Sequence, residues 1–354
     1  MKKYRLSEEL GNIDEAFLEE VFEYQKRSEG RQITMSKKRI IQTVIAAALA
    51  IAVCGITVFA VHMSSLAKLK DYVDKQDDYN NVPDVLKGVD VEEVGTDFVE
   101  NVEPGEAKIT SIVAGENGFM ATFDVNINDS DLVDKVEDWE LGWYSWNNFA
   151  IYEITPDGEK LRFGGALSGP QLVSCENGIL TFGLDGFANS GLPDELGFSA
   201  DGFVFHNVIT DEEVEYTFEH GFDTSVKKDS YTEMETLTSK EPQNIKGIEF
   251  SIKMDGLGLL LYADEMTVEE HNDVILYIWN ECLLKFTLKD GTEIIDMPVL
   301  NLEKMSAEEY FAPDRINLLS GGGTQRNGIY YKFATVFDIT QIESVEIEGA
   351  VFTF

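Results

Sequence analysis

"KITSIVAGENGFMATFDVNI", residues 108–127, decides the fold class, because two apolar runs flank a short turn in it. From about Ala107 the hydrophobic period is two, as in strands that bury one face. Gly115 to Gly118 lie between the runs and provide the turn. The stretch therefore predicts a pair of antiparallel strands.

The same pattern recurs toward the C-terminus. "FAIYEITPDGEKLRFGG" (149–165) predicts a hairpin that turns at Pro156-Asp157-Gly158. Many short strands with Gly- and Asp-containing turns are typical of β-sandwiches. Further β-patterned segments are 213–220, 245–264, 273–294, 328–339 and 342–354. Short helical insertions are expected at 131–141, 266–271 and 306–311.

An apolar run precedes the β-patterned region. Ile40 to Val61 gives 22 residues without a formal charge, and as a helix it is about 33 Å long, enough for a hydrocarbon core of about 30 Å. A signal peptide has a shorter apolar region close to its N-terminus, and a lipoprotein cysteine follows that region rather than sitting inside it as Cys54 does. The run predicts a transmembrane helix over 40–61.

Charge predicts how the span is oriented. Lys37, Lys38 and Arg39 directly precede it, and the flank before it carries more Lys and Arg than the flank after it. We therefore expect a cytoplasmic N-terminus and an extracytoplasmic C-terminal region in the cell membrane. The chain has a net charge of −37, which repels nucleic acid and anionic lipid at long range.

The segment before the span predicts an amphipathic helix. Apolar residues recur there at spacings of three or four, while acidic residues line the middle of the other side. A helix lying on lipid would have a basic polar face, so a protein groove is the favoured partner and a bland juxtamembrane helix the alternative. The expected contact residues are Leu10, Ile13, Phe17, Leu18 and Val21.

Residues 6–27, "LSEELGNIDEAFLEEVFEYQKR", followed by a basic cluster and one span, resemble single-pass anti-sigma-factor-like membrane proteins of Gram-positive, clostridia-type bacteria. The matching element is Ile13 to Glu20. The C-terminal "TLKDGTEI" and "FATVFDITQIESVEIEGAVF" also resemble the ends of that family's ectodomains. The resemblance implies an extracytoplasmic-function sigma factor as the cytoplasmic partner and immunoglobulin-like β-domains outside.

These observations predict a mainly β ectodomain of two immunoglobulin-like β-sandwich units, one transmembrane helix and a short N-terminal amphipathic helix. A polar segment at 226–244 separates the two units. Residues 62–105 carry interleaved Lys and Asp, a solvated pattern, and are expected to form a helical stem that runs into an acidic linker. The predicted organisation is a cytoplasmic segment (1–39), the span (40–61), the stem (62–105), the first domain (106–226) and the second domain (244–354).

Catalytic patterns are absent from the sequence. The four histidines fall in no zinc motif, and the chain has no nucleophile elbow and no phosphate loop. Residues 1–39 contain neither His nor Cys, so the zinc arrangement of one anti-sigma class is missing. We therefore predict a non-enzyme without metal or cofactor.

Three smaller features have two interpretations each. Cys175 and Cys282 are expected to be buried free thiols, with a disulfide as the alternative in an oxidising compartment. The aromatic cluster in 141–149 is expected to fill a core, with ligand binding as the alternative. Residues 320–324, "SGGGT", are expected to form a flexible loop and not a nucleotide-binding fingerprint, because no βαβ unit surrounds them.

Two functional hypotheses follow. The favoured one is a membrane-anchored regulator whose inner helix binds a sigma factor and whose outer β-domains sense the envelope. The alternative is a non-enzymatic surface binding module held at the membrane, with an inner segment that serves only insertion. The outer ligand is unknown in both.

Overall fold

The computed structural model describes most of the chain from residue 65 onward. The described ranges are 65–98, 102–127, 142–176, 178–207, 212–297, 304–306, 312–325 and 327–354. They belong to one compact unit, Val58–Phe354. The predicted helix with Leu10, Ile13, Phe17, Leu18 and Val21, the flank Lys37, Lys38 and Arg39, and the predicted span over 40–61 lie outside these ranges.

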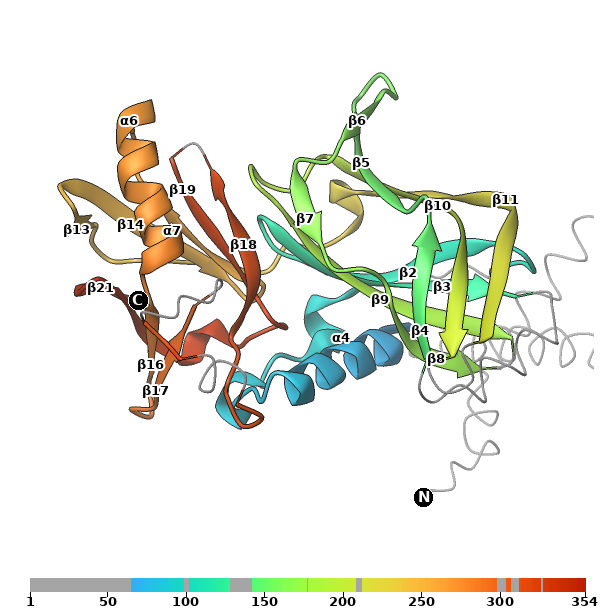
Figure 1. Ribbon diagram of the computed structural model, residues 1–354, viewed down its shortest axis with the longest axis horizontal. Helices are drawn as coiled ribbons and strands as arrows, with labels where there is room; N and C mark the ends of the chain where they lie inside the picture. The colour runs from blue at the N-terminus through green and yellow to red at the C-terminus, as the bar shows by residue number, and fades with distance from the viewer. Residues whose placement is uncertain are drawn as a thin grey trace, which may run out of the picture. The chain divides into compact units, whose positions relative to one another are not determined.

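The described residues are mainly β-structure, in four antiparallel sheets, which confirms the predicted β-rich class (Figure 1). Two of the sheets lie in the N-terminal part and two in the C-terminal part. None of the helices in the described ranges has both the length and the apolar character that a bilayer crossing requires.

The two N-terminal sheets form what we call the N-terminal sheet pair. The first sheet has the order β1-β2-β3-β9-β7, with β8 also paired to β9. The second has the order β11-β10-β5-β6, with β4 also paired to β10. The strands are β1 (Thr96–Asp97), β2 (Ala107–Ala114), β3 (Gly118–Asn126), β4 (Gly142–Asn147), β5 (Ala150–Ile154), β6 (Lys160–Arg162), β7 (Gly165–Leu167), β8 (Gln171–Glu176), β9 (Ile179–Ala188), β10 (Glu195–Asn207) and β11 (Glu212–Lys227).

Aromatic rings fill the core between these two sheets. Phe123 and Phe182 stack with ring centroids 5.5 Å apart, and Trp146 of the other sheet lies 5.2 Å from Phe123 and 4.8 Å from Phe182. Such contacts add about 0.5–1.5 kcal/mol per pair beyond area burial. The structure therefore places Trp146 in a core, as expected for the aromatic cluster. The side chains of residues 142–144 are not described.

The two C-terminal sheets form the C-terminal sheet pair. One sheet has the order β12-β14-β15-β19-β18, with β13 also paired to β14, and the other has the order β17-β16-β20-β21. The strands are β12 (Leu237–Thr238), β13 (Gln243–Ile245), β14 (Ile248–Asp255), β15 (Gly258–Tyr262), β16 (Leu284–Leu288), β17 (Glu293–Asp296), β18 (Leu319–Gln325), β19 (Gly328–Phe333), β20 (Ile342–Ile347) and β21 (Ala350–Thr353).

One β-patterned segment of the C-terminal sheet pair is helical over its first nine residues. Within 273–294, residues up to Glu281 are helical and only the rest forms the hairpin β16–β17. The buried residues Val274, Ile275 and Ile278 have helical spacing and pack into the core. The helical elements are α6 (Val268–Glu270), the π-helical turn η4 (His271–Ile275) and α7 (Leu276–Glu281). The insertion expected at 266–271 is thus longer than predicted, and those at 131–141 and 306–311 fall largely outside the described ranges.

Both sheet pairs have the same strand order. We number the strands of the N-terminal sheet pair from β2 and those of the C-terminal sheet pair from β14, and count β4 with β5, and β7 with β8, as one strand each. In both pairs, one sheet then has the order 1-2-6-5 and the other has the order 4-3-7-8. The two halves therefore repeat one topology.

The segment "SGGGT" is a strand and not a flexible loop. It lies within β18, at the edge of its sheet and paired with β19. A Cβ on Gly322 would lie 3.0 Å from the Trp279 ring, and one on Gly323 would lie 3.0 Å from Asn189 of the N-terminal sheet pair. The glycines thus allow close packing on both sides, which local sequence patterning does not reveal.

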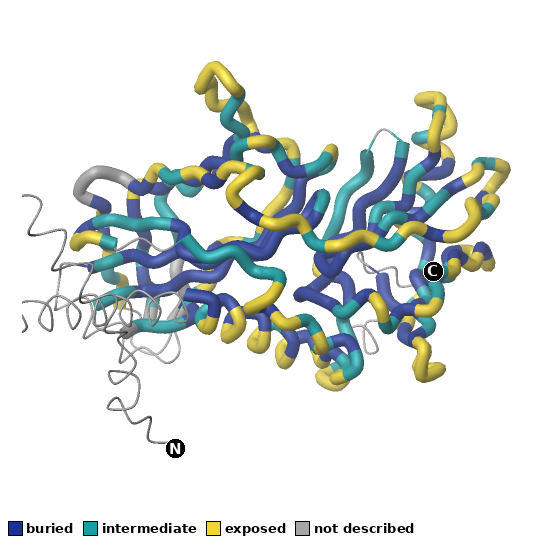
Figure 2. Tube along the Cα trace, turned by 180° about the vertical axis from the view of Figure 1, so that it is seen from behind, coloured by how far each residue is buried: buried dark blue, intermediate teal, exposed yellow. Residues whose placement is uncertain are grey.

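The first part of the expected stem is a helix, as predicted, but it is not solvated on all sides. Residues 65–79 form a helix, which we call the junction helix, and one of its faces is buried (Figure 2). Leu66, Leu69, Tyr72 and Val73 are all at most 4% exposed. Short elements connect the rest of the chain: η2 (Asp84–Leu86), α4 (Val91–Val94), η3 (Lys228–Ser230) and η5 (Ile339–Gln341).

Candidate functional site

The candidate site is the junction where the junction helix meets both sheet pairs. The apolar stripe of the helix belongs to a core cluster of its own. This cluster takes Val113 and Met120 from the N-terminal sheet pair and Leu257 and Val336 from the C-terminal part. Burial of such a stripe, and not helix propensity, accounts for most of a helix's stability in a protein. The helix is therefore part of the folded body.

Tyr72 shows how closely the helix packs on the N-terminal sheet pair. It is 1% exposed, and a Cβ on Gly183 of β9 would lie 2.4 Å from its ring. Only glycine leaves room for the aromatic ring at this position of the strand.

Charged groups also hold the helix on the N-terminal sheet pair. Lys68 Nζ lies 3.0 Å from Asp124 Oδ2 of β3, and Thr181 Oγ1 donates to the other oxygen of that carboxylate at 2.6 Å. Lys75 Nζ donates to the backbone carbonyl of Val173 at 2.6 Å. Hydrogen bonds from a charged donor are roughly twice as strong as neutral ones.

Contacts from the helix to the C-terminal sheet pair are different in kind. Thr335 Oγ1 lies 3.4 Å from the carbonyl of Val73. At the end of the helix, Asn81 adopts a left-handed backbone with φ 52°, a conformation common just after a helix. Its side-chain amide donates to the carbonyls of Pro313 at 2.9 Å and Arg315 at 3.0 Å. These contacts use neutral groups and backbone atoms.

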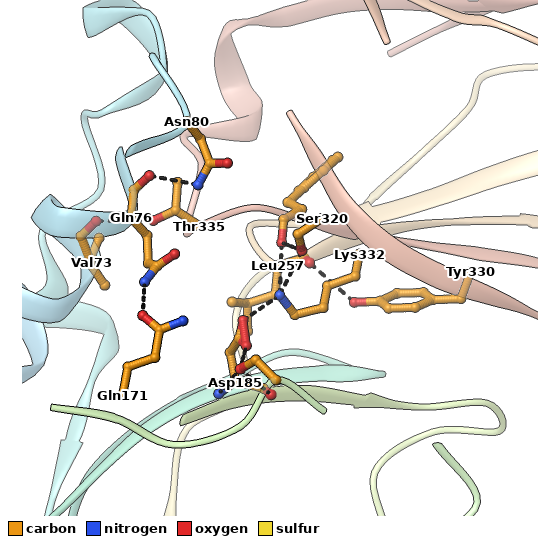
Figure 3. A network of polar contacts seen from close by, with 12 residues as sticks. Val73, Gln76, Asn80, Gln171, Asp185, Leu257, Ser320, Tyr330, Lys332 and Thr335 are labelled. Atoms are coloured by element: carbon orange, nitrogen blue, oxygen red, sulfur yellow. Dashed lines mark hydrogen bonds and ion pairs between the residues drawn. The ribbon is translucent and has the colours of Figure 1, made fainter. Parts of the chain in front are cut away.

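The two sheet pairs also meet directly through a buried ion pair (Figure 3). Lys332 Nζ of β19 lies 2.5 Å from Asp185 Oδ2 of β9, and their side chains are 9% and 7% exposed. The same ammonium donates to Ser320 Oγ at 2.8 Å and to the carbonyl of Phe333 at 3.2 Å. Asp185 also accepts a hydrogen bond from Ser168. All three ammonium protons are therefore used, as a buried charge requires.

A second direct contact joins two turns. Asp255 Oδ2, at the end of β14, accepts a hydrogen bond from the backbone N–H of Glu116 at 2.8 Å. Its Oδ1 accepts from Leu257 N at 2.8 Å and Gly258 N at 3.0 Å. A Cβ on Gly115 would lie 2.1 Å from this carboxylate. The turn between β2 and β3, identified from the sequence, is thus also a contact surface.

A cavity of about 340 Å³ opens at the junction. Gln76 and Gln171 line it and hydrogen bond to each other at 2.9 Å (Figure 3). Tyr79 at its rim is 82% exposed. The Lys332–Asp185 pair also reaches the lining, so a molecule in this cavity would contact the junction helix and both sheet pairs.

Asp77 is the titratable group that the helix buries at this junction. Its side chain is 4% exposed, and burial raises its pKa from the ordinary 3.8 to about 6. A hydrogen bond from Thr335 and the charge of Lys87 oppose this rise of the pKa. Its Oδ1 has no hydrogen-bond partner among the described residues.

Sequence patterning did not identify these residues. Asp77 stands in a polar stretch, and Lys332 and Asp185 are single charges in otherwise uncharged strands. The local sequence shows neither that Lys332 pairs with Asp185, 147 residues away, nor that Asp77 is buried. The predicted contact residues 10–21 and the basic residues 37–39 cannot be placed relative to the junction, because they fall outside the described residues.

The thiols and metal-ligating groups give no reactive centre in the described ranges. Cys282 is a free, buried thiol, as expected, whereas Cys175 is only half-buried. Burial raises the pKa of Cys282 to about 12, which opposes thiolate formation. No group of three or more His, Cys, Asp or Glu side chains with metal-binding geometry occurs in that part of the chain.

Comparison with known proteins gives little. No protein-family model matches the chain, and no curated protein matches it either. A solved structure described as "the conserved domain protein from Bacillus anthracis" is 11% identical, with a TM-score of 0.34, over 74% of this chain and 73% of that one. A likeness at this level assigns neither fold family nor function.

Proposed function

We propose that the chain is a single-pass, membrane-anchored regulator that resembles an anti-sigma factor. In this proposal the inner helix binds an extracytoplasmic-function sigma factor, and the β-rich body outside senses the envelope without catalysing a reaction. One observation carries it: the junction helix, which follows the predicted span after only three residues, is buried against both sheet pairs.

The coupling follows from that packing. Movement of one sheet pair against the other must strain or release the junction helix, because the helix contacts β2, β3 and the segment after β19. A helix transmits displacement along its axis, and packed interfaces switch between discrete arrangements instead of deforming continuously. The helix is the natural route by which a change outside would reach the span.

We further propose that both sheet pairs are immunoglobulin-like sandwiches. Their shared order 1-2-6-5 and 4-3-7-8 corresponds to strands A-B-E-D in one sheet and C′-C-F-G in the other. In domains of this kind the loops gather at the two ends of the sandwich, where they form the binding loops of variable domains. The strand order therefore supports a sensing or binding role for the body.

The test is capture of sigma factors by the full chain in lipid nanodiscs. We expect one sigma factor of the host to be retained, and expect Ile13→Asp combined with Phe17→Asp to abolish its retention. Glu20→Gln, on the predicted polar face, is the matched control and should retain it. Failure of the wild-type chain to retain any sigma factor would refute the proposal.

The junction cavity favours a second candidate, a surface binding module that is only anchored by the span. Its lining combines amide and hydroxyl groups with the Lys332–Asp185 pair beside exposed Tyr79, a set of groups suited to a polar ligand. Under this alternative, deletion of residues 4–27 leaves the cellular phenotype unchanged, whereas the regulator requires those residues.

A further inference from the structure

The carboxyl group of Asp77 is unusual because it is buried where the junction helix meets the C-terminal sheet pair. On the same helix, Asp71, Asp74 and Asp78 are exposed. Asp77 instead points into the body, where its Oδ1 has no hydrogen-bond partner among the described residues. A buried oxygen of this kind is tolerated in a neutral carboxylic acid and costly in a carboxylate.

The groups that face Asp77 do not neutralise a carboxylate. Lys87 is the cation that acts on it, but that ammonium is shared with Asp78 at 3.5 Å and Asp84 at 3.7 Å. Asp74 and Asp78 on the same helix add like charge. From the C-terminal sheet pair it faces the hydroxyl of Thr335, which also lies within reach of the carbonyl of Val73.

We propose that Asp77 makes docking of the junction helix sensitive to pH, so that acidification of the exterior tightens the helix onto the C-terminal sheet pair and a rise in pH loosens it. The pH sensitivity concerns the regulator proposed above, and its role in signalling rests on that proposed function. The docking equilibrium itself belongs to the β-rich body and does not depend on any sigma factor.

The sign follows from proton linkage. Docking raises the pKa of Asp77 from 3.8 to about 6, so the docked helix binds a proton more readily than the released helix does. The stabilisation of the docked helix is complete below about pH 3.8, the pKa in the released helix, and is lost as pH rises through about 6, the pKa in the docked helix. Docking is expected to be about tenfold stronger at about pH 5 than at about pH 7.5.

Hydrogen–deuterium exchange of residues 65–79, in the full chain in nanodiscs and corrected for intrinsic exchange rates, measures this equilibrium. In the wild-type chain, protection should rise about tenfold between about pH 7.5 and about pH 5. Asp77→Asn should remove most of that change, whereas Asp71→Asn, an exposed position on the same helix, should keep it.

Two results would overturn the inference: a wild-type helix whose protection does not depend on pH, or an Asp77→Asn variant with the full wild-type response. If Asp77→Asn unfolds the body, seen as lost protection of β3 and β19 at both pH values, Asp77→Ser replaces it. Capture of the sigma factor is scored separately, so the two proposals can fail independently.

Discussion

The junction helix contacts its two neighbours in different ways. Toward the N-terminal sheet pair it offers the ammonium groups of Lys68 and Lys75 and the ring of Tyr72. Toward the C-terminal sheet pair it offers backbone carbonyls and the buried acid Asp77. Burial raises the pKa of Asp77 to about 6, so this group changes its charge near neutral pH.

This difference indicates where the junction can open. Contacts to the N-terminal sheet pair combine two lysine side chains with the closely packed ring of Tyr72, so the helix should stay with that pair. Contacts to the C-terminal sheet pair weaken when Asp77 loses its proton. The buried pair Lys332–Asp185 then remains as a direct polar tie between the two sheet pairs, beside the hydrogen bond from Glu116 N–H to Asp255.

The largest effect is expected when one partner of the Lys332–Asp185 ion pair is removed. Lys332→Met leaves the buried Asp185 without its cation, which should lower the free energy of unfolding by about 3–5 kcal/mol. Urea unfolding of the full chain in mild detergent measures it. The double variant Lys332→Met with Asp185→Leu should recover most of the loss, since a neutral pair needs no partner. A loss no larger than that from Lys160→Met, which breaks an exposed pair with Asp223, would contradict this expectation.

The next effect tests whether the helix serves both neighbours. Leu69 is fully buried in the junction cluster, so Leu69→Ala should lower the free energy of unfolding by about 2–4 kcal/mol through the cavity it leaves. Hydrogen exchange should show β3 and β19 losing protection together. Loss confined to one sheet pair would mean that the helix stabilises that pair alone.

A smaller effect is expected on the side of the N-terminal sheet pair. Lys68→Met removes the cation from the nearly buried Asp124, and should lower the free energy of unfolding by about 1–3 kcal/mol. Thr181 still donates to the carboxylate and limits the loss. Asp74→Asn breaks the exposed Lys70–Asp74 pair and, as a control, should change stability by less than about 0.5 kcal/mol.

The smallest effect tests the side of the C-terminal sheet pair. Thr335→Val keeps the shape of the side chain but removes the hydroxyl that lowers the pKa of Asp77. The free energy of unfolding should therefore fall by about 1 kcal/mol. The midpoint of the pH-dependent protection should move above about 6, because the carboxylate then loses a donor. A pH titration by exchange measures the midpoint. A shift to lower pH would show that Thr335 does not donate to Asp77.

Local patterning predicted the strands well wherever the turn lies in the same segment. The turn at Gly115–Gly118 and the hairpin that turns at Pro156–Gly158 are both present, between β2 and β3 and between β5 and β6. It was less successful over 273–281, where β-branched and aromatic residues favour a strand by composition. The helix forms there because Val274, Ile275 and Ile278 bury one helical face in the core.

Length, charge and hydrophobic period are thus enough to predict an acidic, β-rich body, its turns and an apolar run of membrane-spanning length. These properties can be predicted from the sequence alone, because they depend on neighbours within a few residues. The junction depends on tertiary structure instead. Lys332 meets Asp185 across 147 positions, and Asp77 differs from the exposed aspartates around it only because the C-terminal sheet pair covers it. Burial and long-range pairing set the energy of a charge, and neither is encoded by the residues beside it.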